Sequence, residues 1–244
     1  MKRICLLFLF ALCGCYTISP PPSFVYQEIK TDTYKLASWQ KMTDPSSAIR
    51  IYFEGDGYAF NHAGHPTSDP TPRGVFLRKI AFNDPNPNVV YLARPCQYVK
   101  DDQCSQKDWT TGRFSQKIVS SVAQAVTSVA GKRNVVLIAY SGGALLSGLV
   151  IEQTPQLHVQ EWVTLAGLLN HEKWTTELKL PPLKDSLDLQ KLPNVKQLHL
   201  IGDKDKTIPY KMTQALVKSK DLIVIVKATH NSGFEQYYST IYQQ

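Results

Sequence analysis

Short apolar segments alternate with segments of helical periodicity along most of this 244-residue chain. The clearest strand candidate is residues 135–139, Val-Val-Leu-Ile-Ala, whose composition suits a strand buried on both faces of a parallel sheet. Residues 114–130 instead carry apolar side chains at the spacing of a helix. Strands that alternate with helices predict an α/β fold with a mostly parallel, doubly wound sheet flanked by helices.

The predicted elements fill most of the chain after residue 34. The strand candidates are residues 48–53, 88–93, 135–139, 162–166, 196–201 and 222–226, and the helix candidates are residues 74–82, 114–130, 142–152, 210–218 and 234–242. Residues 168–194 show neither a strand pattern nor a helix pattern, and we predict that they form a small cap or no cap. At 43% apolar and 19% charged residues, a chain of this length can bury one core, so we predict one domain over residues 34–244.

The first fifteen residues have the three parts of a secretory signal. Lys2 and Arg3 precede an apolar run over residues 4–11, which is too short to span about 30 Å of hydrocarbon as a helix. The run ends in Leu-Cys-Gly-Cys at residues 12–15, which resembles the bacterial lipobox, in which a thiol takes a diacylglyceryl group. We predict a signal peptide over residues 1–14, lipidation at Cys15 and a proline-rich tether over residues 15–33. Ordinary cleavage nearby is the alternative.

This N-terminus predicts a location on the periplasmic side of the cell envelope, with the lipid anchor in a membrane. The residue after Cys15 is Tyr16 and not Asp. By resemblance to enterobacterial sorting, this favours the outer membrane over the inner. The formal net charge is +7, but the basic residues are scattered and no run of five like charges occurs. No zinc-finger spacing or RNA-binding signature accompanies them, so we predict no nucleic-acid partner.

Two cysteines remain in the mature chain. Cys5 and Cys13 leave with the signal and Cys15 is acylated, so Cys96 and Cys104 form one even pair in an oxidising compartment. A metal site is the competing interpretation, but no His or further Cys lies nearby in the sequence. We therefore predict a disulfide that closes a small loop, and no metal.

Ser141 lies at the junction between a predicted strand and a predicted helix. Ala139 and Gly143 flank it at two residues' distance, and small residues are needed there when a tight turn exposes a serine Oγ. The backbone N–H of Gly142 would face a developing oxyanion at the helix N-terminus. The usual pattern is Gly-x-Ser-x-Gly, from which Ala139 departs by one methyl group. The alternative is a simple turn with Ser141 as an N-cap.

An acid and a base follow the later strands. Residues 202–209, Gly-Asp-Lys-Asp-Lys-Thr-Ile-Pro, resemble the acid loop Gly-x-x-Asp-x-x-(Val/Ile)-Pro of α/β-hydrolases, which makes Asp205 the acid and leaves Asp203 as a turn residue. His230 follows the last strand, and the order Ser141, Asp205, His230 is that of this fold. The other histidines are predicted in the core (His199), on connections (His158, His171), or lining the site or capping a loop (His62, His65).

Residues 54–57, Glu-Gly-Asp-Gly, end the first predicted strand. Hydrolases of this fold use a His-Gly turn here to supply a second oxyanion N–H, and Glu54 replaces that His. Because the backbone does this work, we predict the N–H of Asp56 as the second donor. A glycine-rich turn without function is the alternative.

Four further segments carry a family resemblance, residues 53–57, 69–72, 91–98 and 109–115. Together with the Ser141, Asp205 and His230 loops, they resemble a sparsely characterised family of bacterial secreted α/β-hydrolases over roughly residues 48–240. The resemblance implies the α/β-hydrolase fold, the Ser-His-Asp triad and the Cys96–Cys104 bridge. It does not imply a substrate.

Two functions are compatible with these residues. The first is a serine hydrolase, an esterase or lipase-like acyl hydrolase that needs no metal or organic cofactor and acts on a small-molecule or lipid ester, with amides possible. The second is a non-catalytic lipoprotein that keeps the fold as an envelope binding module. The departures at Ala139 and Glu54 favour the second function, and the complete triad favours the first.

Overall fold

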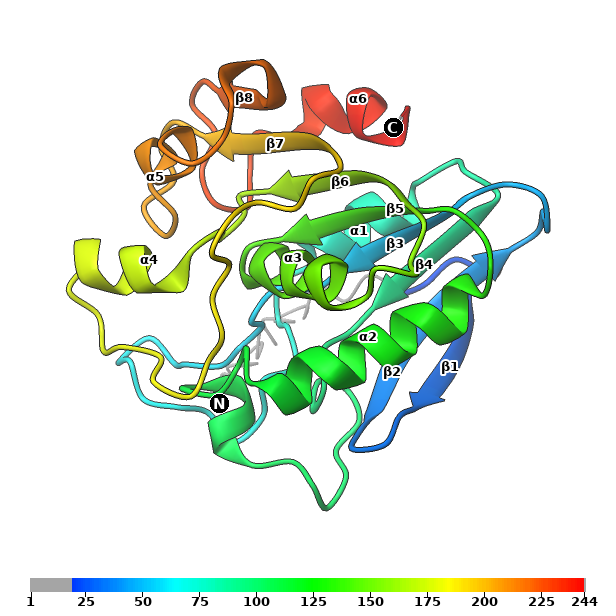
Figure 1. Ribbon diagram of the computed structural model, residues 1–244, viewed down its shortest axis with the longest axis horizontal. Coiled ribbons are helices and arrows are strands. Elements are labelled where there is room, and N and C mark those ends of the chain that lie inside the picture. The colour runs from blue at the N-terminus through cyan, green and yellow to red at the C-terminus, as the bar shows by residue number, and fades with distance from the viewer. Residues whose placement is uncertain (1–18, 244) are drawn as a thin grey trace, which may run out of the picture.

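The computed structural model describes residues 19–243, so the predicted signal peptide, the predicted lipid attachment at Cys15 and the start of the tether lie outside the described residues. One eight-stranded sheet has the order β1-β2-β4-β3-β5-β6-β7-β8 (Figure 1). Its strands are β1 (Val25–Lys30), β2 (Lys35–Met42), β3 (Ile49–Phe53), β4 (Asn88–Leu92), β5 (Val135–Tyr140), β6 (Val159–Leu165), β7 (Lys196–Gly202) and β8 (Leu222–Ile225).

The strands from β4 to β8 in this order are parallel, and β1 and β2 are joined to them by antiparallel pairing. The predicted mostly parallel sheet is therefore confirmed. The structure differs from the sequence prediction at the N-terminus, where β1 lies inside the predicted tether and the domain begins before residue 34. Ile29 is the one buried residue of β1, so backbone pairing with β2 holds a strand whose side chains show little apolar pattern.

Helices cover both faces of the sheet. They are α1 (Phe76–Phe82), α2 (Gln116–Ala130), α3 (Gly142–Gln153), α4 (His171–Glu177), α5 (Tyr210–Gln214) and α6 (Tyr238–Tyr242), with short 3₁₀ turns at Gln106–Trp109, Ser219–Asp221 and Glu235–Tyr237. The predicted helix over residues 210–218 stops at Gln214, because the next turn tightens and the Leu216 N–H bonds the Thr213 carbonyl. The predicted C-terminal helix divides into a 3₁₀ turn and α6.

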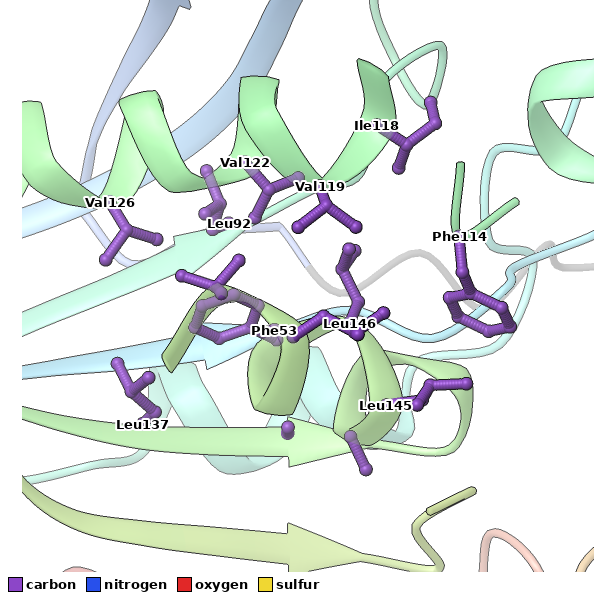
Figure 2. Packing of buried hydrophobic residues seen from close by; sticks show 14 of the residues in the cluster. Phe53, Leu92, Phe114, Ile118, Val119, Val122, Val126, Leu137, Leu145 and Leu146 are labelled. Atoms are coloured by element: carbon purple, nitrogen blue, oxygen red, sulfur yellow. The ribbon is translucent and has the colours of Figure 1, made fainter. Parts of the chain in front are cut away.

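Two hydrophobic cores lie on opposite faces of the sheet. Alternation along the strands sends Phe53 and Leu137 toward α2 and α3, and sends Tyr52 and Ile138 toward α1 and α6. Figure 2 shows the first core, where side chains of α2 and α3 meet those of the strands. Burial on both faces explains why the central strands read as continuous apolar runs.

Residues 168–194 form a small element on α3. They contain α4, and Leu183 and Leu189 are buried in the core. A Cβ on Gly148 of α3 would lie 2.6 Å from the Leu189 side chain, so this segment packs tightly against the helix.

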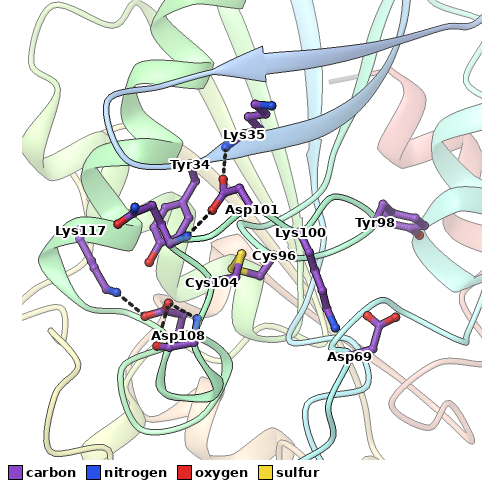
Figure 3. Close-up of a disulfide and its surroundings, with 12 residues drawn as sticks. Tyr34, Lys35, Asp69, Cys96, Tyr98, Lys100, Asp101, Cys104, Asp108 and Lys117 are labelled. Carbon is purple, nitrogen blue, oxygen red and sulfur yellow. Dashed lines mark hydrogen bonds and ion pairs between the residues drawn. A yellow bond between two sulfur atoms is a disulfide. The ribbon is translucent and has the colours of Figure 1, made fainter.

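The predicted Cys96–Cys104 disulfide is present, with Cα atoms 5.7 Å apart (Figure 3). Asp101 lies within the loop that it closes and accepts the Lys35 N–H of β2 at 3.0 Å. Closing a loop of this length stabilises the fold by about 2.5 kcal/mol through chain entropy. The bridge therefore holds the segment after β4 against the sheet. No helix within residues 19–243 has the length and apolar character needed to cross a membrane.

Candidate active site

Ser141, His230 and Asp205 meet beyond the carboxyl ends of the parallel strands. The His230 Nε2 lies 3.0 Å from the Ser141 Oγ, and the His230 Nδ1 lies 2.8 Å from the Asp205 Oδ2. Parallel strands bring their carboxyl ends to one edge of the sheet, which is why residues from three distant loops converge there. The structure thus brings together all three residues that the sequence predicted for the triad.

The backbone around Ser141 is a tight turn between β5 and α3. Ser141 has φ 52° and ψ −126°, a conformation that L-residues rarely adopt, and its N–H bonds the Leu165 carbonyl at 3.1 Å. A Cβ on Gly143 would lie 2.7 Å from the carbonyl oxygens of Phe53 and Glu54. The glycine at 143 therefore allows α3 to start directly against β3, and the Ser141 Oγ faces the pocket.

Backbone hydrogen bonds hold the Asp205 carboxylate in addition to its contact with His230. Its Oδ1 accepts the N–H groups of Thr207 and Ile208, each at 2.8 Å, and the residue is 5% exposed. The second oxygen is then left for the imidazole. Asp203 lies in the turn after β7, as predicted, and accepts the Lys227 N–H at 2.7 Å.

His199, His62 and His65 are not part of the triad. His199 is fully buried in β7, where its Nδ1 lies 2.8 Å from the Thr164 Oγ1, and burial lowers its pKa to about 4. It is a core residue, as predicted. His62 and His65 are exposed and are not among the described residues that line the pocket at Ser141.

A pocket of about 730 Å³ opens at Ser141 and His230. Aromatic side chains form much of its wall, namely Tyr58, Phe60, Phe76, Tyr140, Trp174 and Tyr238. Trp174 comes from α4, and its indole N–H donates to the Thr207 carbonyl at 2.7 Å. The segment over residues 168–194 therefore contributes one wall of the pocket, next to the acid loop.

The two predicted oxyanion donors both line this pocket. Among residues 19–243, neither the Asp56 nor the Gly142 backbone N–H has a hydrogen-bond acceptor, so both are free to bind a ligand oxygen. The Asp56 side chain, to which the sequence assigned no role, is held by two arginines. Arg113 donates to its Oδ2 at 2.6 Å, and Arg94 donates to its Oδ1.

Glu54 supports the same turn from the protein interior. It is buried, its Oε1 accepts the Gly55 N–H at 2.8 Å, and its Oε2 accepts the Tyr91 hydroxyl at 2.5 Å. Burial raises the pKa of this carboxyl above its ordinary value, although both hydrogen bonds oppose the shift. The side chain that replaces the expected His is thus a structural anchor for the turn at Gly55.

No cluster of three or more His, Cys, Asp or Glu side chains suited to a metal ion occurs in the part of the chain that the structure describes.

Comparisons with known proteins address the fold. No protein-family model matches the chain, and no curated protein matches it in sequence. Among solved structures, Est1E from Butyrivibrio proteoclasticus is 14% identical with a TM-score of 0.62, over 89% of this chain and 96% of that one. XC6422 from Xanthomonas campestris, described as an α/β serine hydrolase without lid, is 12% identical with a TM-score of 0.54, over 93% and 94%. Alpha/beta hydrolase domain-containing protein 10 from mouse is 16% identical with a TM-score of 0.60, over 90% and 96%. At these identities the likeness concerns the fold, and the chain has the α/β-hydrolase fold that its sequence predicted.

Proposed function

We propose that this protein is a serine hydrolase that cleaves carboxylic esters with Ser141, His230 and Asp205. The observation that carries the proposal is the hydrogen-bonded series from the Ser141 Oγ through both nitrogens of His230 to the Asp205 carboxylate, at the base of a pocket. Such a series is the arrangement in which a serine hydroxyl becomes a nucleophile.

The reaction follows from the positions of these groups. The Ser141 Oγ attacks the acyl carbonyl and its proton passes to the His230 Nε2, while Asp205 holds the Nδ1–H and stabilises the charged ring. The N–H groups of Asp56 and Gly142 bind the oxyanion. His230 returns the proton to the leaving alkoxide, and water activated by the same imidazole then releases the acid from the acyl-enzyme.

The pocket supports a substrate with substantial apolar surface. Its aromatic wall suits small-molecule or lipid esters, and its volume falls within the usual range for small-molecule sites. Amides remain the alternative leaving-group class for the same triad. Rates on p-nitrophenyl esters of graded chain length, measured beside the matching anilides, separate these substrates.

Labelling with a fluorophosphonate probe tests the proposal directly. We expect the purified full-length chain to react stoichiometrically, with the label located on the Ser141 peptide by mass spectrometry, because His230 removes the Ser141 proton. Heat-unfolded protein is the control and should not react. A folded protein that stays unlabelled would favour the non-catalytic binding module instead.

We also propose that the enzyme acts at the cell envelope, attached through a lipid on Cys15. This proposal rests on the signal and lipobox pattern of residues 1–15. Incorporation of labelled palmitate that disappears in Cys15→Ser would support it. An unmodified, freely released mature chain would contradict it.

Gly142→Ala should reduce activity although the change adds only one methyl group. A Cβ at this position would lie 2.2 Å from the Asp56 Oδ1, and Asp56 is held by two arginines, so the turn that carries an oxyanion donor must move. A misplacement of about 1 Å costs about 10²-fold in rate. We expect a loss of about that size in kcat, measured on a p-nitrophenyl ester. An unchanged kcat would show that the Asp56 carboxylate does not occupy this space.

A further inference from the structure

The Asp56 carboxylate lies directly against the nucleophile turn. Because a Cβ on Gly142 would meet its Oδ1 at 2.2 Å and its Oδ2 at 3.1 Å, the carboxylate lies over the Gly142 Cα. Asp56 therefore touches one oxyanion donor with its side chain and supplies the other with its backbone. The relative position of the two N–H groups depends on where this carboxylate is held.

Two arginines from different segments hold it. Arg94 follows β4, donates to Asp56 and also donates to the Arg113 carbonyl. Arg113 donates to Asp56 at 2.6 Å and, through its Nε, to the Thr110 carbonyl at 2.7 Å. Each arginine side chain is 7% exposed and the Asp56 side chain is 20% exposed, so the three charged groups form a largely buried cluster, the Arg94–Asp56–Arg113 cluster.

The disulfide loop helps to place this cluster. Gln97 lies next to Cys96, accepts the Arg94 N–H at 3.1 Å and donates to the Gly55 carbonyl at 3.0 Å. The segment after β4 thus bonds the turn at Gly55 and also carries Arg94, whose guanidinium donates to Asp56. The position of Asp56 is determined by contacts with several distant segments, which makes it rigid.

Without the two arginines, the negative charge of Asp56 would disfavour the oxyanion. A carboxylate beside an oxyanion hole repels the negative charge that develops on the substrate oxygen. Burial raises the pKa of Asp56, but the guanidinium groups of Arg113 and Arg94 outweigh it and keep the pKa below its ordinary value. Counted as one carboxylate and two guanidinium groups, the three side chains carry a net charge of +1.

We propose that the Arg94–Asp56–Arg113 cluster positions the two oxyanion donors and keeps a net positive charge beside the oxyanion. The inference rests on the proposed hydrolase activity. Asp56 places Gly142 through contact, and the two arginines fix Asp56 and compensate its charge. Arg94 and Arg113 are positioning residues, and Arg113, which also lines the pocket, is the one closer to the substrate.

Single and double substitutions at Arg113 and Asp56 test whether the net charge of the cluster affects the rate. Arg113→Met brings the cluster to zero net charge, Asp56→Asn to +2, and the double variant back to +1. We expect kcat to fall about 10²-fold in Arg113→Met and about 10-fold in Asp56→Asn, with little change in KM, because the defect acts on the transition state. The double variant should recover to within about 10-fold of the parent.

Two further variants keep the test independent of folding. Arg113→Lys preserves the charge and should retain most of the kcat, even though it loses the guanidinium fork. Arg133→Met is the matched control, because Arg133 bonds the Asp44 carbonyl at the amino-terminal edge of β5 and should leave kcat unchanged. Thermal unfolding of every variant identifies losses that come from instability.

Three results would overturn the inference. In the first, Arg113→Met keeps its kcat. In the second, the losses of the single variants multiply in the double variant, as expected for two residues that act independently of each other. In the third, Arg113→Lys is as impaired as Arg113→Met. Failure of the proposed function looks different, because the parent itself would then neither hydrolyse esters nor react with a fluorophosphonate.

Discussion

Replacing Ser141 by alanine is expected to lower kcat for ester hydrolysis by about 10⁶-fold, the size of effect that follows when a triad nucleophile is removed. The Ser141 Oγ is the atom that His230 Nε2 contacts at 3.0 Å, and alanine leaves no group to attack the acyl carbon. Any residual rate would come from the oxyanion donors and binding alone. Steady-state hydrolysis of a p-nitrophenyl ester measures the loss.

The same substitution should leave the fold intact. Alanine meets the same backbone conformation as serine, φ 52°, so the turn is no more strained than before. We expect a melting temperature close to that of the parent. Ser120→Ala on α2 is the matched control and should retain full kcat, since within residues 19–243 the hydrogen-bond partner of the Ser120 hydroxyl is Gln116 on the same helix. If Ser141→Ala kept a tenth of the parent rate, the reaction would not depend on this nucleophile.

Replacing Asp84 by alanine is expected to lower the free energy of unfolding by about 3–5 kcal/mol, the usual result of removing one partner of a buried ion pair. The Asp84 side chain is fully buried, and its Oδ2 accepts from the Arg50 Nε at 2.6 Å and from the Tyr52 hydroxyl at 2.7 Å. Arg50 is 2% exposed and also donates to the Ile241 carbonyl of α6. Asp84 therefore holds the Arg50 side chain, which links β3 to the C-terminal helix.

Urea unfolding measures this effect. After the change, the Arg50 guanidinium would be buried without its carboxylate, and the link to α6 would weaken. Asp185→Ala is the matched control, because the Lys107–Asp185 ion pair is exposed and its loss should hardly move the unfolding midpoint. A midpoint for Asp84→Ala equal to that of this control would show that Asp84 does not stabilise the fold.

The triad was predictable because its signals are local. Ser141 directly follows β5, whereas Asp205 and His230 lie three and five residues beyond the ends of β7 and β8. Parallel strands bring the positions after their carboxyl ends to one edge of the sheet. The nucleophile was also marked by its small neighbour Gly143, which the close approach of Phe53 and Glu54 requires. Local composition and the topology rule were enough for these residues.

The two antiparallel strands were harder to recognise. β1 and β2 lie at one edge of the sheet, where every β1 side chain except Ile29 is exposed and the two strands are joined by backbone pairing. A strand held in this way has no periodic apolar signal. The proline-rich stretch before it therefore led to a tether boundary at residue 34, although Phe24 and Ile29 pack into the two cores.

By itself, the sequence determined the α/β sheet and the order of the triad, because both depend on short runs of residues and on the rules of parallel sheets. It also determined the pairing of Cys96 with Cys104, because these are the two cysteines left after the predicted signal and lipid attachment. Only the tertiary structure decided what surrounds Asp56. Arg94, Arg113 and Gly142 are far apart in the chain, and their contact with one carboxylate exists only after three loops have packed together. Charges brought together by folding leave no periodic pattern in the sequence, since the energy of a buried ion cluster depends on distance and desolvation in space.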